Sequence, residues 1–139
     1  MLGCTRDSAR LERKGVPEHT VLVLDDDPWI LQTVSEILTE AGYRVEAAQS
    51  ALEAARHVAQ APAEIVLLDI RLPGLNGREF AMDLRARHIS SKIIVMSAAH
   101  DANELATEIG ADGVLIKPFD LAELLSEVER LCPSRSNSH

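Results

Sequence analysis

Two apolar patterns alternate along residues 20–132. Short, mostly apolar runs, typical of strands buried in a sheet, predict strands. Each run is followed by a segment whose apolar residues recur at spacings of three and four, which is typical of an amphipathic helix. The predicted strands cover residues 21–24, 44–47, 64–68, 92–96 and 113–116.

Capping and stop signals place the predicted helices. Asp27 suits an N-cap, Pro28 suits the first helical position, and Gly42 ends that helix. Three further segments have the spacing of a capping box, in which a small polar residue precedes a glutamate by three positions. These boxes are Ser50–Glu53, Asp101–Glu104 and Asp120–Glu123. They open helices to about Gln60, to Ile109 and to Leu131, and a further helix follows the loop 72–77 and runs to about Arg87.

A strand and a helix thus alternate five times, which predicts an α/β fold with a parallel sheet covered by helices on both faces. The length of 139 residues fits one domain. We expect that domain at residues 20–132, a flexible extension at 1–19 and a disordered tail at 133–139. Ligands of such sheets bind beyond the carboxyl ends of the strands.

The charge, the apolar runs and the cysteines of the chain limit which classes of binding partner and which cellular compartment we expect. The formal net charge of −8 disfavours binding to nucleic acid and to anionic membranes. No apolar run is long enough to span a bilayer, so we expect a cytoplasmic protein. Cys4 and Cys132 lie far apart without the spacing of a zinc motif, so the sequence predicts neither a cysteine-based zinc site nor a disulfide framework.

Polar residues end four of the predicted strands. They are Asp25 and Asp26, Asp69, Ser97 and Lys117. Taken singly, each residue has an ordinary interpretation as a helix cap, a turn residue or a surface charge. Together they form a set of three carboxylates, a hydroxyl and an ammonium. Such a set suits Mg²⁺ and phosphoryl transfer, with an aspartate as the nucleophile.

Four motifs in this order resemble the receiver domain of two-component response regulators. They are Leu22–Asp27, Leu68–Gly77, Met96–Ala98 and Ile116–Phe119, and the resemblance covers residues 20–132. It implies a doubly wound, flavodoxin-like (βα)5 fold with strand order 2-1-3-4-5. It also implies a phosphoacceptor in a phosphorelay rather than an enzyme with an external substrate. Only self-phosphorylation and self-dephosphorylation are expected.

The resemblance assigns the acidic residues as follows. Asp69 would accept a phosphoryl group from a sensor histidine kinase or a histidine phosphotransfer protein. Asp26, Asp69 and the backbone carbonyl of Arg71 would bind Mg²⁺ directly. Asp25 would act on the ion mainly through a bound water.

The resemblance also assigns the residues of the response. Lys117 would pair with Asp69 and then with a phosphoryl oxygen, while Ser97 would hydrogen-bond another oxygen. The bond between Lys117 and Pro118 is expected to be cis. Val114 stands where the family usually has an aromatic side chain that moves on activation, so switching here would proceed without a ring.

We expect the output to be protein binding, through the face formed by the fourth predicted helix, the fifth strand and the fifth helix. The same face could pair two copies of the chain. The sequence fits either a stand-alone receiver or a receiver taken from a hybrid kinase.

Two alternative functions are retained. One is a receiver-like interaction module with altered switching, which the substitution at Val114 favours. The other is a phosphatase of the haloacid dehalogenase type, because Asp25 and Asp27 have the two-residue spacing of its acidic pair. Pro28 and Trp29 do not match the residues expected after that pair.

Overall fold

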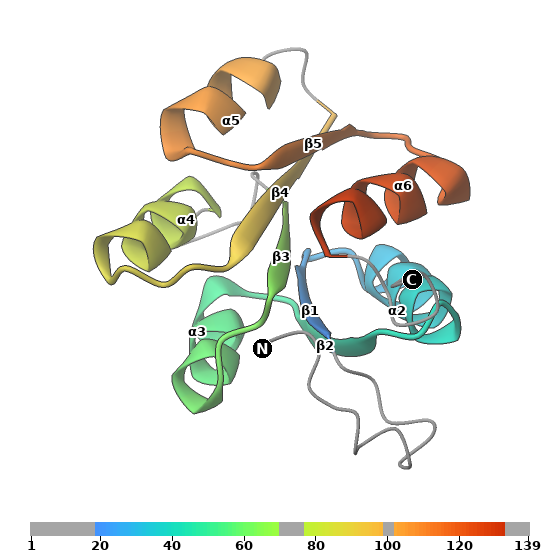
Figure 1. Ribbon diagram of the computed structural model, residues 1–139, viewed down its shortest axis with the longest axis horizontal. Coiled ribbons are helices and arrows are strands. Elements are labelled where there is room, and N and C mark those ends of the chain that lie inside the picture. The colour runs from blue at the N-terminus through green and yellow to red at the C-terminus, as the bar shows by residue number, and fades with distance from the viewer. Residues whose placement is uncertain (1–18, 70–76, 99–101, 133–139) are drawn as a thin grey trace.

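The sheet is formed by five parallel strands. A computed structural model describes residues 19–69, 77–98 and 102–132. The strand order is β2-β1-β3-β4-β5, so the chain reverses direction across the sheet after β2. The strands are β1 (Thr20–Leu24), β2 (Arg44–Ala48), β3 (Ile65–Asp69), β4 (Lys92–Ser97) and β5 (Gly113–Ile116). The predicted doubly wound fold and its strand order are confirmed (Figure 1).

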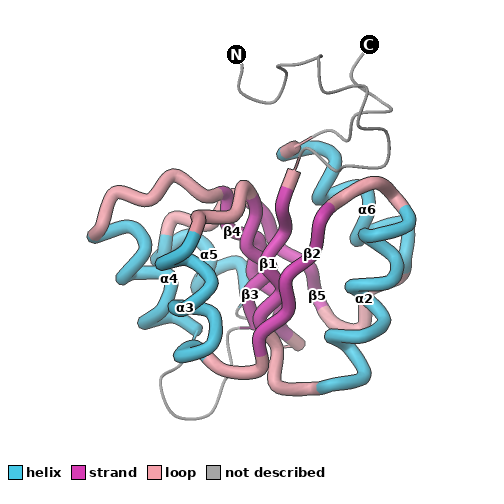
Figure 2. Tube along the Cα trace, turned by 90° about the horizontal axis from the view of Figure 1, so that it is seen from below, coloured by secondary structure: helices cyan, strands magenta, loops and turns pink. Residues whose placement is uncertain are grey.

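Helices cover both faces of the sheet, as Figure 2 shows in a view from below. Two of them, α2 and α6, lie on one face, and α3, α4 and α5 lie on the other. The helices are α2 (Pro28–Glu40), α3 (Ala51–Gln60), α4 (Gly77–Ala86), α5 (Ala102–Ile109) and α6 (Leu121–Leu131).

Alternate residues of each central strand enter the two halves of the core. In β1, Val21 and Val23 pack in the layer with α2 and α6, whereas Leu22 and Leu24 pack in the layer with α3, α4 and α5. This division follows from the two-residue repeat of a strand, whose side chains point to opposite faces. Burial on both faces explains why β1 is an almost continuous apolar run in the sequence.

Side chains cap the helices largely as their sequences predict. Asp27 caps α2 by accepting a hydrogen bond from the Trp29 N–H, and α6 opens with a complete capping box between Asp120 and Glu123. The box at α3 is only half formed, because the Glu53 carboxylate accepts from the Gln49 N–H instead of the Ser50 N–H. The expected cap at Asp101 lies outside the described residues.

Half of the strand boundaries differ from the prediction by one residue. The strand β3 begins and ends one residue later than predicted, and β4 extends to Ser97. The two strand ends move because Asp69 pairs with Met96 in the β3–β4 ladder and Ser97 pairs with Ile116 in the β4–β5 ladder. Two of the polar residues expected beyond the strands are therefore the last residues of strands.

Two further sequence expectations concern the two ends of the chain and membrane-spanning helices. The expected extension (except its last residue, His19) and the expected tail lie outside the described residues. Among the helices that the structure describes, none combines the length and apolarity that a bilayer crossing requires.

Candidate functional site

The carboxyl ends of β1 and β3 bring the predicted acidic residues together. The two strands are neighbours, with Leu24 opposite Leu68 in the register. The residues that follow these partners are Asp25 and Asp69, which therefore lie at the same edge of the sheet. This is the switch point of the doubly wound fold, where its ligands bind.

Carboxylate oxygens of Asp25, Asp26 and Asp69 all lie within 4.8 Å of one another. The side chain of Asp25 is fully buried and that of Asp69 is nearly so, whereas Asp26 is exposed. The cluster thus consists of two buried carboxylates next to one exposed carboxylate. The fit to a hard divalent cation is good, since oxygen ligands at the mouth of a buried acidic cluster are what Mg²⁺ prefers.

Lys117 approaches this cluster from the end of β5. Its Nζ lies 3.0 Å from Asp25 Oδ2 and 3.5 Å from Asp69 Oδ2. The shorter contact is therefore with Asp25, whereas the resemblance implied Asp69. The backbone N–H of Lys117 donates to the Ser97 carbonyl at 2.9 Å, and the following bond to Pro118 is cis.

Burial and charge act in opposite directions on the ionisable groups of the site. Burial raises the pKa of Asp25, with help from the nearby Asp69 charge, although the Asp27 N–H and Lys117 counteract it. Burial lowers the pKa of Lys117, but hydrogen bonds and charges from Asp25 and Asp69 outweigh it and leave this pKa raised. One ammonium facing three carboxylates leaves negative charge uncompensated, which a divalent cation would neutralise.

The other predicted site residues lie on neighbouring strands or outside the described residues. Ser97 is buried at the end of β4, next to the β3 strand that carries Asp69. Val114 is half-buried on β5 and packs against the core layer of α3, α4 and α5. Arg71, whose carbonyl was expected to bind Mg²⁺, lies outside the described residues.

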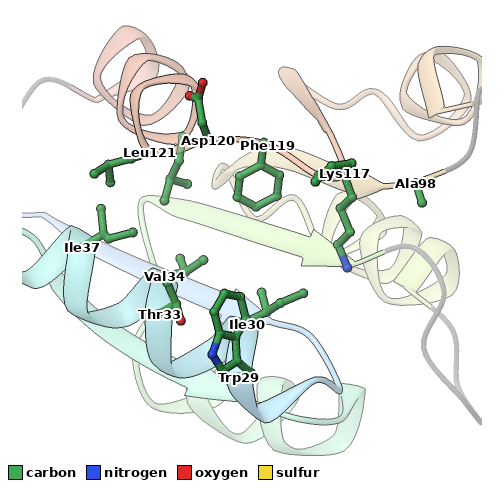
Figure 3. A pocket seen from close by; sticks show the side chains of 12 residues that line it. Trp29, Ile30, Thr33, Val34, Ile37, Ala98, Lys117, Phe119, Asp120 and Leu121 are labelled. Atoms are coloured by element: carbon green, nitrogen blue, oxygen red, sulfur yellow. The ribbon is translucent and has the colours of Figure 1, made fainter.

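An apolar pocket of about 570 Å³ opens beside Lys117, between α2 and the loop that leads into α6 (Figure 3). Its walls include Trp29, Ile30 and Val34 from α2 and Phe119 and Leu121 from the other side. This pocket was not predicted from the sequence. The signal available was Trp29, a tryptophan directly after the acidic cluster, whose side chain is 70% exposed.

Asp27 takes a structural role rather than a place in the cluster. Its Oδ1 accepts the Trp29 N–H at 2.9 Å, and its own N–H donates to Asp25. The phosphatase alternative required Asp25 and Asp27 to work as a catalytic pair. The observed partner of Asp25 is instead Asp69, which lies on another strand.

Comparisons with known proteins agree with this geometry. The family model described as the response regulator receiver domain matches residues 21–129. The chain is 35% identical over 123 residues to the transcriptional regulatory protein PrrA of Mycobacterium leprae, covering 87% of this chain and 53% of PrrA. It is 38% identical over 118 residues to the transcriptional regulatory protein AruR of Pseudomonas aeruginosa, covering 80% of this chain and 48% of AruR. The chain spans about half the length of these relatives.

Solved structures show the same likeness. The chemotaxis protein CheY4 of Vibrio cholerae superposes with a TM-score of 0.76 at 30% identity, over 81% of this chain and 98% of CheY4. The receiver domain of the Francisella response regulator 1452 superposes with a TM-score of 0.76 at 29% identity, over 81% of this chain and 95% of that one. The fold and its acidic edge define a receiver-type α/β domain. The chain belongs to the response regulator receiver family.

Proposed function

We propose that this domain is the phosphoacceptor of a two-component phosphorelay and that Asp69 takes the phosphoryl group. The observation that carries the proposal is the convergence of Asp25, Asp26 and Asp69 with Lys117 at the carboxyl edge of the sheet. A sensor histidine kinase or a histidine phosphotransfer protein would be the donor.

The transfer step requires little from the protein besides placement and charge. A carboxylate oxygen of Asp69 attacks the phosphorus of a phosphohistidine, a P–O bond forms, and the P–N bond breaks. The electron pair of that bond returns to the imidazole of the donor. The product is an acyl phosphate on Asp69, and Lys117 Nζ is close enough to reach one of its oxygens.

Asp25, Asp26 and Asp69 are the residues that would hold Mg²⁺. The ion would supply positive charge that stabilises the transferring phosphoryl group. Asp69 provides the attacking oxygen, and Lys117 keeps the buried Asp25 compensated before transfer. Asp26, the exposed member, leaves the cluster open to solvent, from which the donor arrives.

The response is proposed to pass through the strands that adjoin the acceptor. Ser97 would turn its hydroxyl to a phosphoryl oxygen, and the change would reach α5, β5 and α6. On this face Ile116 is 46% exposed, which suits binding of a protein target or of a second copy. Val114 has no ring to move, so the change would involve the chain after Ser97.

The pocket beside Lys117 offers the donor protein an apolar contact next to the acceptor. We expect Trp29→Ala to slow transfer from a phosphohistidine protein more than labelling by acetyl phosphate. Leu52→Ala is the matched control, because Leu52 is 63% exposed on α3 at the opposite face. Equal rates for wild type and Trp29→Ala with a protein donor would remove this pocket from the donor surface.

The direct test is intact-mass measurement after incubation with acetyl phosphate and Mg²⁺. We expect a single phosphoryl adduct on wild type, none on Asp69→Asn, and none on wild type when EDTA removes the metal. Asp83→Asn is the matched control, since Asp83 is an exposed acid of α4 that pairs with Arg87. An adduct on Asp69→Asn equal to that on wild type would overturn the proposal.

A receiver-like interaction module that works without phosphorylation is the second candidate. It is favoured by Val114, which lacks the aromatic ring of the family's switch. This candidate predicts that wild type takes no adduct from acetyl phosphate yet retains binding to its target. Cytoplasmic location is part of the proposal, since the donors of this family's chemistry act there.

A further inference from the structure

A second cluster of ligand-type side chains lies at the opposite, amino-terminal edge of the sheet. His19 directly precedes β1, Glu64 directly precedes β3, and Cys132 is the C-cap residue of α6. One ligand atom from each of these three residues lies within 4.8 Å of the other two. The cluster joins a nitrogen, an oxygen and a sulfur donor from three distant parts of the chain.

Backbone hydrogen bonds fix His19 and Glu64 relative to each other. The Thr20 N–H donates to Glu64 Oε1 at 3.0 Å, and the Glu64 N–H donates to the Thr20 carbonyl at 3.0 Å. The His19 carbonyl accepts from the Arg44 N–H at 2.9 Å, which ties this residue to β2 as well. The two ligand-type side chains therefore project from a rigid part of the sheet.

Cys132 is held in place from the other side. Its N–H donates to the Val128 carbonyl at 2.9 Å, and its own carbonyl accepts from the buried hydroxyl of Tyr43 at 2.9 Å. The Tyr43 ring in turn lies against the His19 ring, with 6.3 Å between centroids. These contacts fix the backbone of Cys132 beside His19.

The donor set selects a class of metal. Imidazole and thiolate suit Zn²⁺ and similar transition metals and do not suit Mg²⁺. His19 Nδ1 and Glu64 Oε1 are 3.3 Å apart, which is close to the spacing of about 3.4 Å between nitrogen and oxygen ligands on tetrahedral zinc. The Cys132 sulfur lies within 4.8 Å of both of these ligand atoms and would complete the set.

The cluster is buried but reachable. His19 and Cys132 are 3% and 6% exposed, while the Glu64 side chain is 46% exposed. Glu64 and Cys132 also line a surface pocket of about 300 Å³, together with Ser90, Ser91 and Lys92. The charge of Lys92 opposes a cation there, but its side chain is exposed and can turn away into solvent.

We propose that His19, Glu64 and Cys132 form a binding site for a zinc-class metal ion. Three protein ligands would hold the ion and a water molecule would fill the fourth position. Binding releases the thiol proton of Cys132 to solvent and places the metal between imidazole, carboxylate and thiolate. The ion would tie the end of α6 to the start of β1 and β3. This site is separate from the proposed phosphoacceptor and goes beyond it.

Cobalt is the probe of choice, because a thiolate ligand gives Co²⁺ a charge-transfer band in the near ultraviolet. We expect the full chain, reduced and in saturating Mg²⁺, to bind one equivalent of Co²⁺ with this band and tetrahedral visible bands. Zn²⁺ should displace the Co²⁺ and bleach both. Zn²⁺ at about 100-fold above its Kd should raise the Tm by roughly 10 °C.

Matched variants test whether Co²⁺ binds at these three residues or elsewhere on the chain. Cys132→Ser should lose the thiolate band, while Cys4→Ser keeps it. Glu64→Gln should weaken Co²⁺ binding by more than about tenfold, since loss of even an outer partner has that effect. Glu46→Gln, an acid that pairs with His57 instead, should leave the affinity unchanged.

Three outcomes would overturn the site. One is a wild type with no thiolate band, which needs no variant to fold and would mean that His19 and Glu64 form only an ion pair. Another is a band that survives in Cys132→Ser and disappears in Cys4→Ser. The third is Co²⁺ binding that Asp69→Asn abolishes and Glu64→Gln does not, which would place the ion at the acidic edge.

Discussion

The two edges of the sheet carry different chemistry on the same scaffold. At the carboxyl edge, Asp25, Asp69 and Lys117 gather charged oxygen and nitrogen groups around the ends of β1, β3 and β5. At the amino edge, His19 and Cys132 place softer donors at the start of β1 and the end of α6, beside Glu64 at the start of β3. Because β1 and β3 are adjacent in the sheet, each edge receives one group from each of them.

The two edges differ in how far their carboxylates are compensated by nearby donors. The carboxyl edge buries acids without full compensation, which raises the pKa of Asp25. At the amino edge, burial also raises the pKa of Glu64, but hydrogen bonds from His19 and the Thr20 N–H outweigh it and leave this pKa lowered. The carboxyl edge therefore retains negative charge that a cation would neutralise, whereas hydrogen bonds within the amino edge favour the ionised form of Glu64.

The largest effect is expected for Lys117→Met at the carboxyl edge. The variant leaves the buried Asp25 beside Asp69 without its cation, and we expect a loss of about 2–3 kcal/mol of unfolding free energy at neutral pH. Urea unfolding measures this loss, and saturating Mg²⁺ should recover part of it. Lys92→Met, an exposed lysine at the other edge, serves as control and should cost less than about 0.5 kcal/mol. Equal losses for both variants would contradict the contrast.

Tyr43→Phe probes the amino edge. The change leaves the carbonyl of Cys132 without its buried hydroxyl donor, and we expect a loss of about 1–2 kcal/mol in urea unfolding. Labelling by acetyl phosphate should keep the wild-type rate, because the two edges lie at opposite ends of the strands. A variant that is as stable as wild type but labels more slowly would reverse the roles assigned to the edges.

Asp120→Ala tests the helix that links the two edges. Loss of the capping box should cost about 1 kcal/mol, and Asp120→Asn should cost less because it keeps an acceptor. Ser50→Ala, in the half-formed box of α3, should cost less than Asp120→Ala. Thermal unfolding distinguishes these variants, and the opposite ranking would show that the second half of the box contributes nothing.

The smallest effect concerns an ion pair on the surface of α6. The hydrogen bond from Arg130 lowers the pKa of Glu127, although burial opposes the change. A lowered pKa in the folded state contributes stability that is complete above the ordinary value of 4.5 and is lost as the pH falls through the folded value. Arg130 is half-exposed, so the contribution should be no more than about 0.5 kcal/mol. Comparison of wild type and Glu127→Gln between pH 6 and pH 3 should show it.

The sequence predicted the carboxyl edge and missed the amino edge for one physical reason. Asp25, Asp69 and Lys117 each end an apolar run, so the alternating pattern that predicts the strands also places these residues together. His19, Glu64 and Cys132 meet only through tertiary packing, and 45 residues separate the first two. No local spacing reveals such a cluster, which is why a rule based on cysteine spacing predicted no zinc site.

Finer features depended on side-chain positions that a pattern cannot give. The pattern placed Lys117 at the acidic edge but could not say that its Nζ lies nearer to Asp25 than to Asp69. The pocket beside Trp29 was also not predicted, because its walls come from α2 and from the segment before α6. Local signals did give the helix starts, since Asp27 and Asp120 act within one turn of their own positions.

The contact between Lys117 and Asp25 joins residues 92 positions apart, and it has a consequence for the chain as it is made. A ribosome-bound chain that ends before residue 117 already contains β1, β3 and β4, and with them the acids that repel one another. The ammonium that pairs with Asp25 is added only when β5 and the residue that follows it emerge. The acidic edge is therefore complete only when almost all of the domain has been synthesised.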